Sequence, residues 1–322
     1  MPDNHRQAFH DLRQHLESII VGQSVLLDRL LIALLTGGHV LLEGPPGLAK
    51  TTAVTALASG VHASAQRIQF TPDLMPGDLT GSDVYDAKAS AFRFVPGPVF
   101  HEIILADEIN RAPPKVQSAL LEAMQEHQVT VNGVTHPLPE LFIVMATQNP
   151  LEQSGTYPLP EAQLDRFLMH VEIDYPDEED ELEILRRDRQ RQLSQQTLEA
   201  DSRIQPATVL QARQEVAAMH VDEAIERYIV SLVTATRKPQ KYLVDQPDYI
   251  ELGASPRASL SMLHAARAVA YLQDRDYVIP EDVIDVSKDI LRHRIILSFA
   301  AQADRKDKNQ IIQSLIDVVP IP

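Results

Sequence analysis

The chain has 322 residues, of which 44% are hydrophobic and 23% are charged, and its formal net charge at pH 7 is -16. This composition is typical of a globular protein with one large domain or two unequal ones, and it excludes a disordered or fibrous chain. The acidic balance disfavours loose binding to nucleic acid or to an anionic membrane, because such binding requires clustered Lys and Arg. The sequence contains no cysteine, which excludes disulfides, thiolate catalysis and cysteine-ligated zinc. We therefore expect a cytoplasmic location.

The N-terminal segment, residues 1–20, is polar and lacks the uninterrupted apolar core of a signal peptide. The longest apolar stretches, such as Leu30–Leu35, are far shorter than the roughly 20 residues that span a bilayer. We expect a soluble protein without membrane insertion.

The first half of the chain alternates short apolar runs with helical patterns, which predicts an α/β fold with a parallel sheet between layers of helices. Each run is rich in Val, Ile, Leu or Phe and is followed by a turn or a helix start, as buried parallel strands are. The five predicted strands are His39–Glu43, Arg67–Phe70, Ile103–Asp107, Leu141–Thr147 and Leu168–Ile173.

Two excursions interrupt this alternation. Residues 71–98 form a long stretch rich in Pro and Gly, with a possible hairpin around residues 84–86 and 92–95. A stretch of that length inside a compact domain is usually functional. Residues 129–137 read VTVNGVTHP, and the Asn132-Gly133 pair predicts a second hairpin, since Asn-Gly is the strongest short hairpin signal.

The composition changes after Ile173 to a charged, helical connector, and the rest of the chain has the pattern of helices. Residues 223–236, 257–273 and 282–293 carry apolar side chains at three- and four-residue spacing. We predict an α/β domain over residues 1–185 and a small all-α domain over residues 186–322.

A strand, a Gly-rich loop and a helix follow one another around Lys50, in the order that a phosphate-binding loop requires. The loop would turn backbone N–H groups toward phosphates, Lys50 would reach the β and γ phosphates, and the Thr51 hydroxyl would bind Mg²⁺. Ala49 departs from the usual pattern, which has glycine before the lysine. The alternative is a Pro/Gly turn beside a solvated lysine. The candidate nucleotide-binding residues here are Gly44, Pro45, Pro46, Gly47, Leu48, Ala49, Lys50, Thr51 and Thr52.

Polar side chains end two later strands. Asp107 and Glu108 follow an apolar run, so Asp107 could hold Mg²⁺ and Glu108 could orient or deprotonate the water that attacks a γ-phosphate. Asn149 follows the next run, at the carboxyl edge where open α/β sheets bind ligands. Solvated acids at a strand end, and an Asx turn before Pro150, are the alternatives for these positions.

Long ordered segments of the chain resemble the MoxR family of AAA+ ATPases over roughly residues 20–295. The segments that carry the resemblance are EGPPGLAKT, LADEINRAPPKVQSALLEAMQE, MATQNPLEQSGTYPLPEAQLDRF and GASPRA. In this family alanine before the loop lysine is usual, which accounts for Ala49. The resemblance implies an AAA+ core, a helical lid and the hydrolysis of ATP with Mg²⁺.

The resemblance also assigns roles to single residues. It implies that the loop from Gly44 to Thr51 is the Walker A motif, that Asp107 and Glu108 are the Walker B pair, and that Asn149 is sensor 1. Gly22 and Gln23 match the segment that lies against the adenine.

Two arginines match residues that contact phosphates from a distance. Arg166 resembles the arginine finger that such proteins insert into the neighbouring subunit's site. Arg257 resembles sensor 2, which reaches from the lid to the γ-phosphate. A planar cation that keeps its proton suits a phosphoryl oxygen, and this agrees with both roles. On residue type alone, each could equally be a surface or ion-pair arginine.

Partners follow from the resemblance and not from any pattern in the residues. We expect a homohexameric ring that remodels, assembles or matures partner proteins, with possible metal-centre insertion beside a separately encoded von Willebrand factor A domain protein. The two excursions would contact the client. The alternatives are a nucleic-acid motor or regulator, a nucleotide-regulated scaffold, and a magnesium-chelatase-like motor subunit. Acidic charge and a 5% aromatic content disfavour the nucleic-acid motor.

Overall fold

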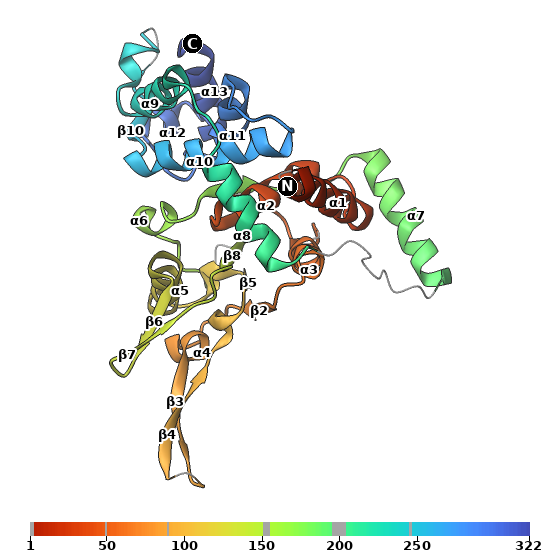
Figure 1. Cartoon of the computed structure of the whole chain (residues 1–322). Helices are drawn as coiled ribbons and strands as arrows, with labels where there is room; N and C mark the ends of the chain where they lie inside the picture. The colour runs from red at the N-terminus through yellow and green to blue at the C-terminus, as the bar shows by residue number, and fades with distance from the viewer. Residues whose placement is uncertain (1–2, 49, 89, 151–154, 195–203, 245–246) are drawn as a thin grey trace.

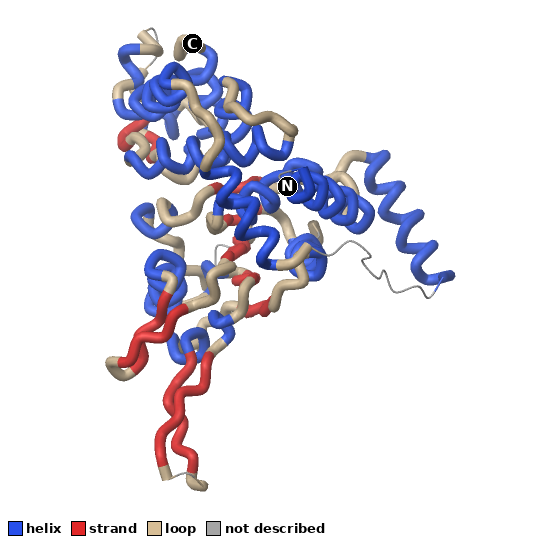
Figure 2. Tube along the Cα trace, viewed as in Figure 1, coloured by secondary structure: helices blue, strands red, loops and turns tan. Residues whose placement is uncertain are grey.

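The computed structural model describes residues 3–48, 50–88, 90–150, 155–194, 204–244 and 247–322. Five parallel strands form the central sheet in the order β2-β5-β8-β1-β9, which confirms the predicted α/β core (Figures 1 and 2). The strands are β1 (Val40–Glu43), β2 (Ala65–Gln69), β5 (Ile103–Asp107), β8 (Ile143–Gln148) and β9 (Met169–Glu172).

Successive residues of the inner strands face two different cores, since side chains alternate along a strand. Leu42 and Leu105 belong to the core shared with the N-terminal helices and the lid, whereas Leu41 and Ile104 belong to the core under α5. Both faces of the sheet are therefore buried, which explains why the strands are almost continuously apolar. The helices that flank the sheet are α1 (Asp3–Ile19), α2 (Ser24–Thr36), α3 (Lys50–Gly60), α4 (Pro76–Thr80), α5 (Pro114–Glu126) and α6 (Glu161–Leu164), with short 3₁₀ turns at Pro98–Phe100 and Ile109–Arg111.

The two excursions form antiparallel hairpins that project together from the end of the molecule opposite the lid (Figures 1 and 2). The first pairs β3 (Gly81–Asp86) with β4 (Ala91–Pro96), and the second pairs β6 (Gln128–Val131) with β7 (Val134–Pro137). Asn132 Nδ2 donates a hydrogen bond to Asp83 Oδ2 at 2.8 Å, which links the two hairpins.

Three of the lid helices, α9, α10 and α11, begin within two residues of their predicted starts. Ser255 and Asp222 cap α10 and α9 with their side-chain oxygens, and Pro280 opens α11. One element was not predicted: β10 (Ile250–Leu252) pairs antiparallel with β11 (Ile296–Leu297), so the lid is not entirely helical. The lid helices are α8 (Pro206–Ala217), α9 (Glu223–Arg237), α10 (Pro256–Leu272), α11 (Pro280–Leu291), α12 (Phe299–Ala303) and α13 (Lys308–Val318), with a 3₁₀ turn at Pro239–Lys241.

A charged helix, α7 (Glu178–Ser194), connects the sheet to the lid and stands apart at the right of Figure 1. Arg187 attaches it to α1 by donating to the carbonyl oxygens of Glu17 and Ser18, at 3.0 and 2.8 Å. The division predicted between residues 185 and 186 falls inside this continuous helix. The exact division into two domains stays a prediction.

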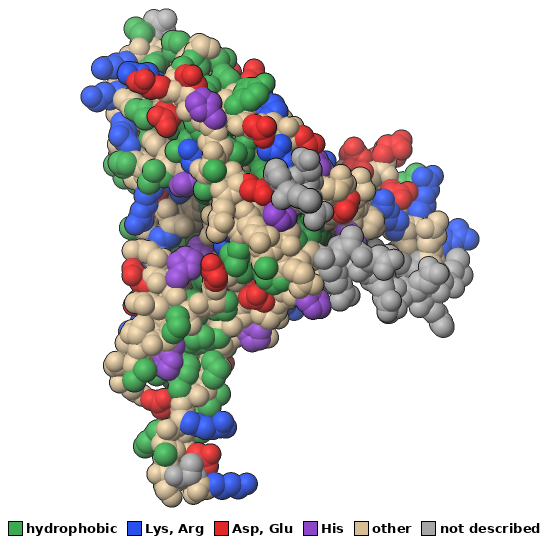
Figure 3. Space-filling model, in the orientation of Figure 1, with side chains coloured by type: hydrophobic (Ala, Val, Ile, Leu, Met, Phe, Trp, Pro, Cys, Tyr) green, Lys and Arg blue, Asp and Glu red, His purple; other side chains and the backbone are tan. Residues whose placement is uncertain are grey.

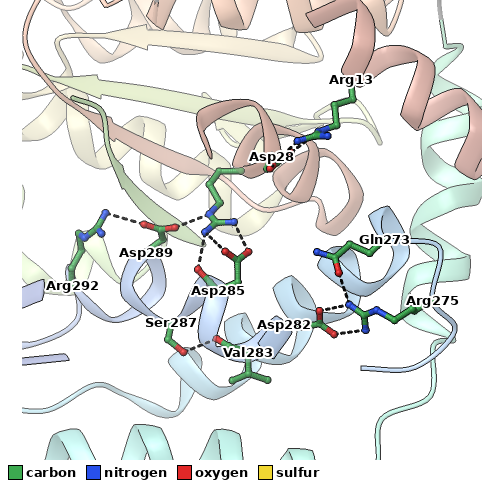
Figure 4. A network of polar contacts seen from close by, with 11 residues as sticks. Arg13, Asp28, Gln273, Arg275, Asp282, Val283, Asp285, Ser287, Asp289 and Arg292 are labelled. Atoms are coloured by element: carbon green, nitrogen blue, oxygen red, sulfur yellow. Dashed lines mark hydrogen bonds and ion pairs between the residues drawn. The ribbon is translucent and has the colours of Figure 1, made fainter. Parts of the chain in front are cut away.

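Buried arginines attach the lid to the rest of the molecule (Figure 4). Arg29 of α2 is 5% exposed and donates to Asp289 Oδ2 at 2.6 Å and to Asp285 Oδ2 at 2.7 Å, both on α11. Arg292 pairs with Asp289 at 3.0 Å and donates to the carbonyl oxygen of His170 in β9 at 2.7 Å. The lid is therefore seated against α2 and β9.

Within the described part of the chain, no helix combines the length and the apolar character needed to cross a membrane.

Replacing Arg29 with alanine should destabilise the fold markedly. We expect the free energy of unfolding to fall by about 3 kcal/mol, at the low end for a broken buried ion pair, because Arg292 still pairs with Asp289. Urea denaturation measures this loss. The matched control is Arg227→Ala, which removes an exposed helix pair with Glu223 and should cost only about 0.3–0.5 kcal/mol. Equal losses for both variants would contradict the structural role given to Arg29.

Candidate functional site

The carboxyl ends of β1, β5 and β8 meet at one edge of the sheet, because the three strands are parallel neighbours. The loop after β1 leads directly into α3, so the helix N-terminus and the strand ends face the same space. A cleft with a volume of about 390 Å³ lies there. Its walls are formed by Pro46, Gly47, Leu48, Lys50, Thr51, Thr52, Asp107, Glu108, Thr147, Gln148 and Asn149.

The loop between β1 and α3 is held tightly against neighbouring backbone. A Cβ atom on Gly44 would lie 2.5 Å from the carbonyl oxygen of Ile173, so only glycine fits there. Gly47 has φ = +87°, in the left-handed region that favours glycine. Ala49, expected to belong to this loop, lies outside the described residues.

The Lys50 ammonium lies at the centre of the loop. Its Nζ donates to the carbonyl oxygen of Gly44 at 2.6 Å and to that of Gln148 at 3.4 Å. Burial lowers the pKa of Lys50, while the nearby carboxylates of Asp107 and Glu108 oppose that shift. The loop lysine and the two acids therefore face one another across the cleft.

The Asp107 carboxylate is held from two sides. Thr147 of β8 donates its hydroxyl to Asp107 Oδ1 at 2.6 Å, and Arg67 of β2 donates from Nη2 to Asp107 Oδ2 at 2.6 Å. Thr147 is only 1% exposed, so its hydroxyl is a fixed part of the site. Neither partner follows from the sequence, because their contact with Asp107 depends on the order of the strands in the sheet.

Glu108 has an unusual backbone conformation that directs its side chain into the cleft. Its φ is 57°, in the left-handed region, and its backbone N–H donates to Thr147 Oγ1 at 2.9 Å. Its Oε2 accepts hydrogen bonds from Gln69 Nε2 at 2.7 Å and from Arg111 Nη1 at 3.0 Å. Gln69 ends β2 opposite Asp107, and its contact with Glu108 does not follow from the sequence for the same reason.

Asn149 follows β8 and is 9% exposed. It lines the cleft together with Lys50 and Glu108, so the three sequence motifs that contain these residues converge at one place.

A second cleft, with a volume of about 400 Å³, adjoins the first. The two clefts share walls formed by Pro46, Gly47 and Leu48. Val21 and Gln23 line one side, and the apolar side chains of Ile184 and Leu185 in α7 line the other. Gln23 is fixed by a hydrogen bond from Nε2 to the carbonyl oxygen of Asp174 at 3.0 Å. Gly22, with φ = +72°, packs against the side chain of Asp180. This apolar cleft beside the phosphate loop has the character of a base-binding pocket.

Arg166 lies at the other edge of the sheet. It precedes β9, and two residues later the N–H of Leu168 bonds to the carbonyl oxygen of His39 at 2.8 Å, before β1 begins. The phosphate loop follows the opposite end of β1. A four-residue strand rises about 13 Å at roughly 3.3 Å per residue, which separates Arg166 from its own chain's loop.

Arg257 lies beside Arg166 and not beside the phosphate loop. Both arginines line a cleft between core and lid that has a volume of about 320 Å³, together with Asp165 and His264. Arg257 Nη1 is 3.8 Å from Asp165 Oδ2. Arg257 is therefore placed away from its own chain's phosphate loop, because the lid packs on α2 and β9. Its role as sensor 2 stays a prediction. In Figure 3 the surface is hollowed between lid and core, and Lys, Arg and His side chains gather around the hollow.

The chain is similar in sequence to known proteins. Residues 39–169 match the ATPase family associated with various cellular activities (AAA), and residues 245–315 match an AAA lid domain. The Chaperone MoxR1 of Mycobacterium tuberculosis is 47% identical over 94% of this chain and 80% of its own length. Protein MoxR of Paracoccus denitrificans is 33% identical over 98% of this chain and 96% of its own length.

The chain belongs to the MoxR family of AAA+ ATPases. The crystal structure of a Cytophaga hutchinsonii protein described as an ATPase superposes with a TM-score of 0.91 at 46% identity, covering 100% of this chain and 97% of that one. The protein is therefore an ATP hydrolase.

Replacing Thr147 with valine should slow hydrolysis more than it weakens nucleotide binding. Valine keeps the shape but removes the hydroxyl that bonds both Asp107 and the Glu108 N–H. A misplacement of about 1 Å at reacting groups costs about 10²-fold in rate. We expect a kcat loss of about that size with a small change in KM, measured by steady-state phosphate release. Thr236→Val is the matched control, because it removes a buried hydroxyl with two hydrogen bonds in the lid, away from the cleft. A large KM increase with unchanged kcat would contradict the role given to Thr147.

Proposed function

We propose that this MoxR-family protein works as a ring, expected to be a homohexamer, in which each ATP site is completed by a neighbouring subunit and hydrolysis drives the remodelling or assembly of a client protein. The observation that carries this proposal is the placement of Arg166 and Arg257. Both lie in the cleft between core and lid, at the edge of the sheet away from their own chain's phosphate loop.

On this proposal the phosphate end of ATP binds in the first cleft. Backbone N–H groups of the loop and the N-terminus of α3 favour the negative phosphates, and Lys50 adds a positive charge. Thr51 and Asp107 line the same cleft with hard oxygen donors, which suit Mg²⁺. The bound ion would neutralise phosphate charge. The base would lie in the adjoining apolar cleft, beside Gln23.

Glu108 is the proposed general base for the attacking water. Its carboxylate faces the cleft and is oriented by Gln69 and Arg111. Asn149, at the end of the adjacent strand, is placed to hold that water or a γ-phosphate oxygen. The residues proposed for catalysis in one chain thus come from three neighbouring strands.

Among the described residues, Arg166 and Arg257 lie away from their own chain's phosphate loop, whereas Arg67 and Arg111 are paired with Asp107 and Glu108. We propose that the neighbour supplies Arg166 and Arg257, which its lid and core present together. An arginine finger supplied in trans is worth about 10³–10⁵ in rate. That corresponds to about 4–7 kcal/mol of activation free energy.

The two hairpins are the proposed contact with the client. They project from the end away from the lid (Figure 1). The first hairpin carries exposed aromatic side chains. Tyr85 and Phe92 are 56% and 72% exposed, with their rings packed edge to face at 5.4 Å. A separately encoded von Willebrand factor A domain protein, and maturation of a metal centre, remain part of this proposal. The name Chaperone MoxR1, carried by a relative, supports a protein client.

The proposal is tested by phosphate release per subunit over a wide dilution series with ATP and Mg²⁺. We expect the specific activity of the wild type to rise with protein concentration, because catalysis requires two subunits. Arg166→Ala should stay low throughout, with a loss of about 10³-fold or more. Glu108→Gln is the control for loss of chemistry within a subunit. Activity that is independent of concentration, with Arg166 dispensable, would reduce the protein to a self-contained ATPase.

A further inference from the structure

A buried arginine of the lid is bonded to the short loop that carries Arg166. The side chain of Arg294 is 2% exposed, and every nitrogen of its guanidinium has an acceptor. Within the lid it reaches the carbonyl oxygen of Ile290 and the hydroxyl of Ser261. Its other contacts are all to residues 165–168 of the core. They are Asp165 Oδ1 at 2.7 Å from Nε, Phe167 O at 2.7 Å and Asp165 O at 3.4 Å from Nη2, and Leu168 O at 3.1 Å from Nη1.

The Asp165 carboxylate extends this connection to the helix that carries Arg257. One oxygen accepts from Arg294, and the other accepts from Ser255 Oγ at 3.0 Å. Ser255 in turn caps α10 by accepting from the N–H of Arg257 at 3.2 Å. A single chain of hydrogen bonds therefore runs from Arg294 through Asp165 and Ser255 to the start of α10.

This network lies immediately behind the cleft that Arg166 and Arg257 share. Asp165 precedes Arg166 in the chain, while Arg257 keeps its guanidinium half exposed, with a side-chain exposure of 51%. The backbone at both positions is thus anchored, and the two cationic ends are left to face the cleft. The anchor belongs partly to the lid and partly to the core, so the two arginines share one rigid support.

We propose that Arg294 is a positioning residue for ATP hydrolysis in the neighbouring subunit, because it holds the Arg166 loop and the Arg257 helix in a fixed arrangement. The proposal rests on the shared site proposed above. Arg294 does not touch the nucleotide of either subunit. It fixes the positions of Arg166 and Arg257, which are supplied to the neighbouring subunit's site.

Arginine suits this position because its planar guanidinium presents five N–H donors in a fixed geometry. Lysine keeps the charge but has three donors on one nitrogen, so it cannot reproduce the contacts that Arg294 makes from three nitrogens to six acceptor atoms. A displacement of about 1 Å at the reacting end costs about 10²-fold in rate. Arg294→Lys should therefore lower kcat by about that factor and leave KM for ATP nearly unchanged.

The decisive measurement is complementation in mixed rings, because a defect in delivering arginines differs from a defect in the nucleotide site. Arg294→Lys keeps its own nucleotide site intact, whereas Lys50→Ala keeps its arginines intact. Mixing the two variants should raise phosphate release well above the sum of the separate proteins. Mixing Arg294→Lys with Arg166→Ala should give no rise, because neither subunit then delivers its arginines correctly.

Two controls separate positioning from loss of folding. Arg29→Lys changes another buried arginine that holds the lid but does not contact residues 165–168, so it should lower the melting temperature without this complementation pattern. Ser255→Ala removes the two bonds of the Ser255 hydroxyl in the same network and should give a smaller kcat loss, with the same rescue by Lys50→Ala. If Arg294→Lys fails to fold, the proposal is tested by the rescue of Ser255→Ala by Lys50→Ala in mixed rings.

The outcomes distinguish this inference from the shared site on which it rests. Rescue of Arg166→Ala by Lys50→Ala, without rescue of Arg294→Lys or Ser255→Ala, would leave the shared site standing and refute the positioning role. Absence of rescue for Arg166→Ala itself would refute the shared site. Rescue of all three variants by Lys50→Ala is the expected result.

Discussion

The parallel direction of the five strands is the constraint on which the rest of this structure depends. Because every strand runs the same way, the sheet has one edge of carboxyl ends and one edge of amino ends. The phosphate loop, the acids and Asn149 lie at the first edge, and the loop with Arg166 lies at the second. A chain built in this way separates the loop after β1 from Arg166 and Arg257 by the length of a strand. The proposed ring follows from that separation, since only another subunit can bring the two edges together.

The carboxylates of Asp107 and Glu108 are oriented by residues of the neighbouring strands. Thr147 of β8 bonds both Asp107 and the backbone of Glu108, while Gln69 of β2 bonds the Glu108 side chain. Asp107 ends β5, the middle strand of the three, and Glu108 follows it. Both acids therefore have hydrogen-bond partners on the strands at either side of β5. Buried or half-buried carboxylates need such partners, because an unpaired charge removed from water is costly. The same contacts that stabilise the acids also fix where they point.

The lid is placed by buried charges as well as by apolar packing. Arg29 and Arg292 bring α2 and β9 against α11, and Arg294 brings the Arg166 loop against α10 and α11. Each of these guanidinium groups loses water on burial and recovers the cost only with several well-formed hydrogen bonds. Such geometry allows little freedom, so it selects one position of the lid. In that position Arg257 lies beside Arg166 and away from its own chain's phosphate loop.

The sequence by itself determined the α/β class, the five strands, the phosphate loop and the acidic pair, because each depends on local spacing and residue type. The hairpin turn at Asn132 and the cap at Ser255 are local in the same sense. Only the tertiary structure decided that Arg67, Gln69 and Thr147 surround the acids, since strand order is not written in any single strand. It also decided the side on which Arg257 lies. That position depends on ion pairs between Arg29 and residues more than two hundred positions away, and no local pattern encodes a contact of that range.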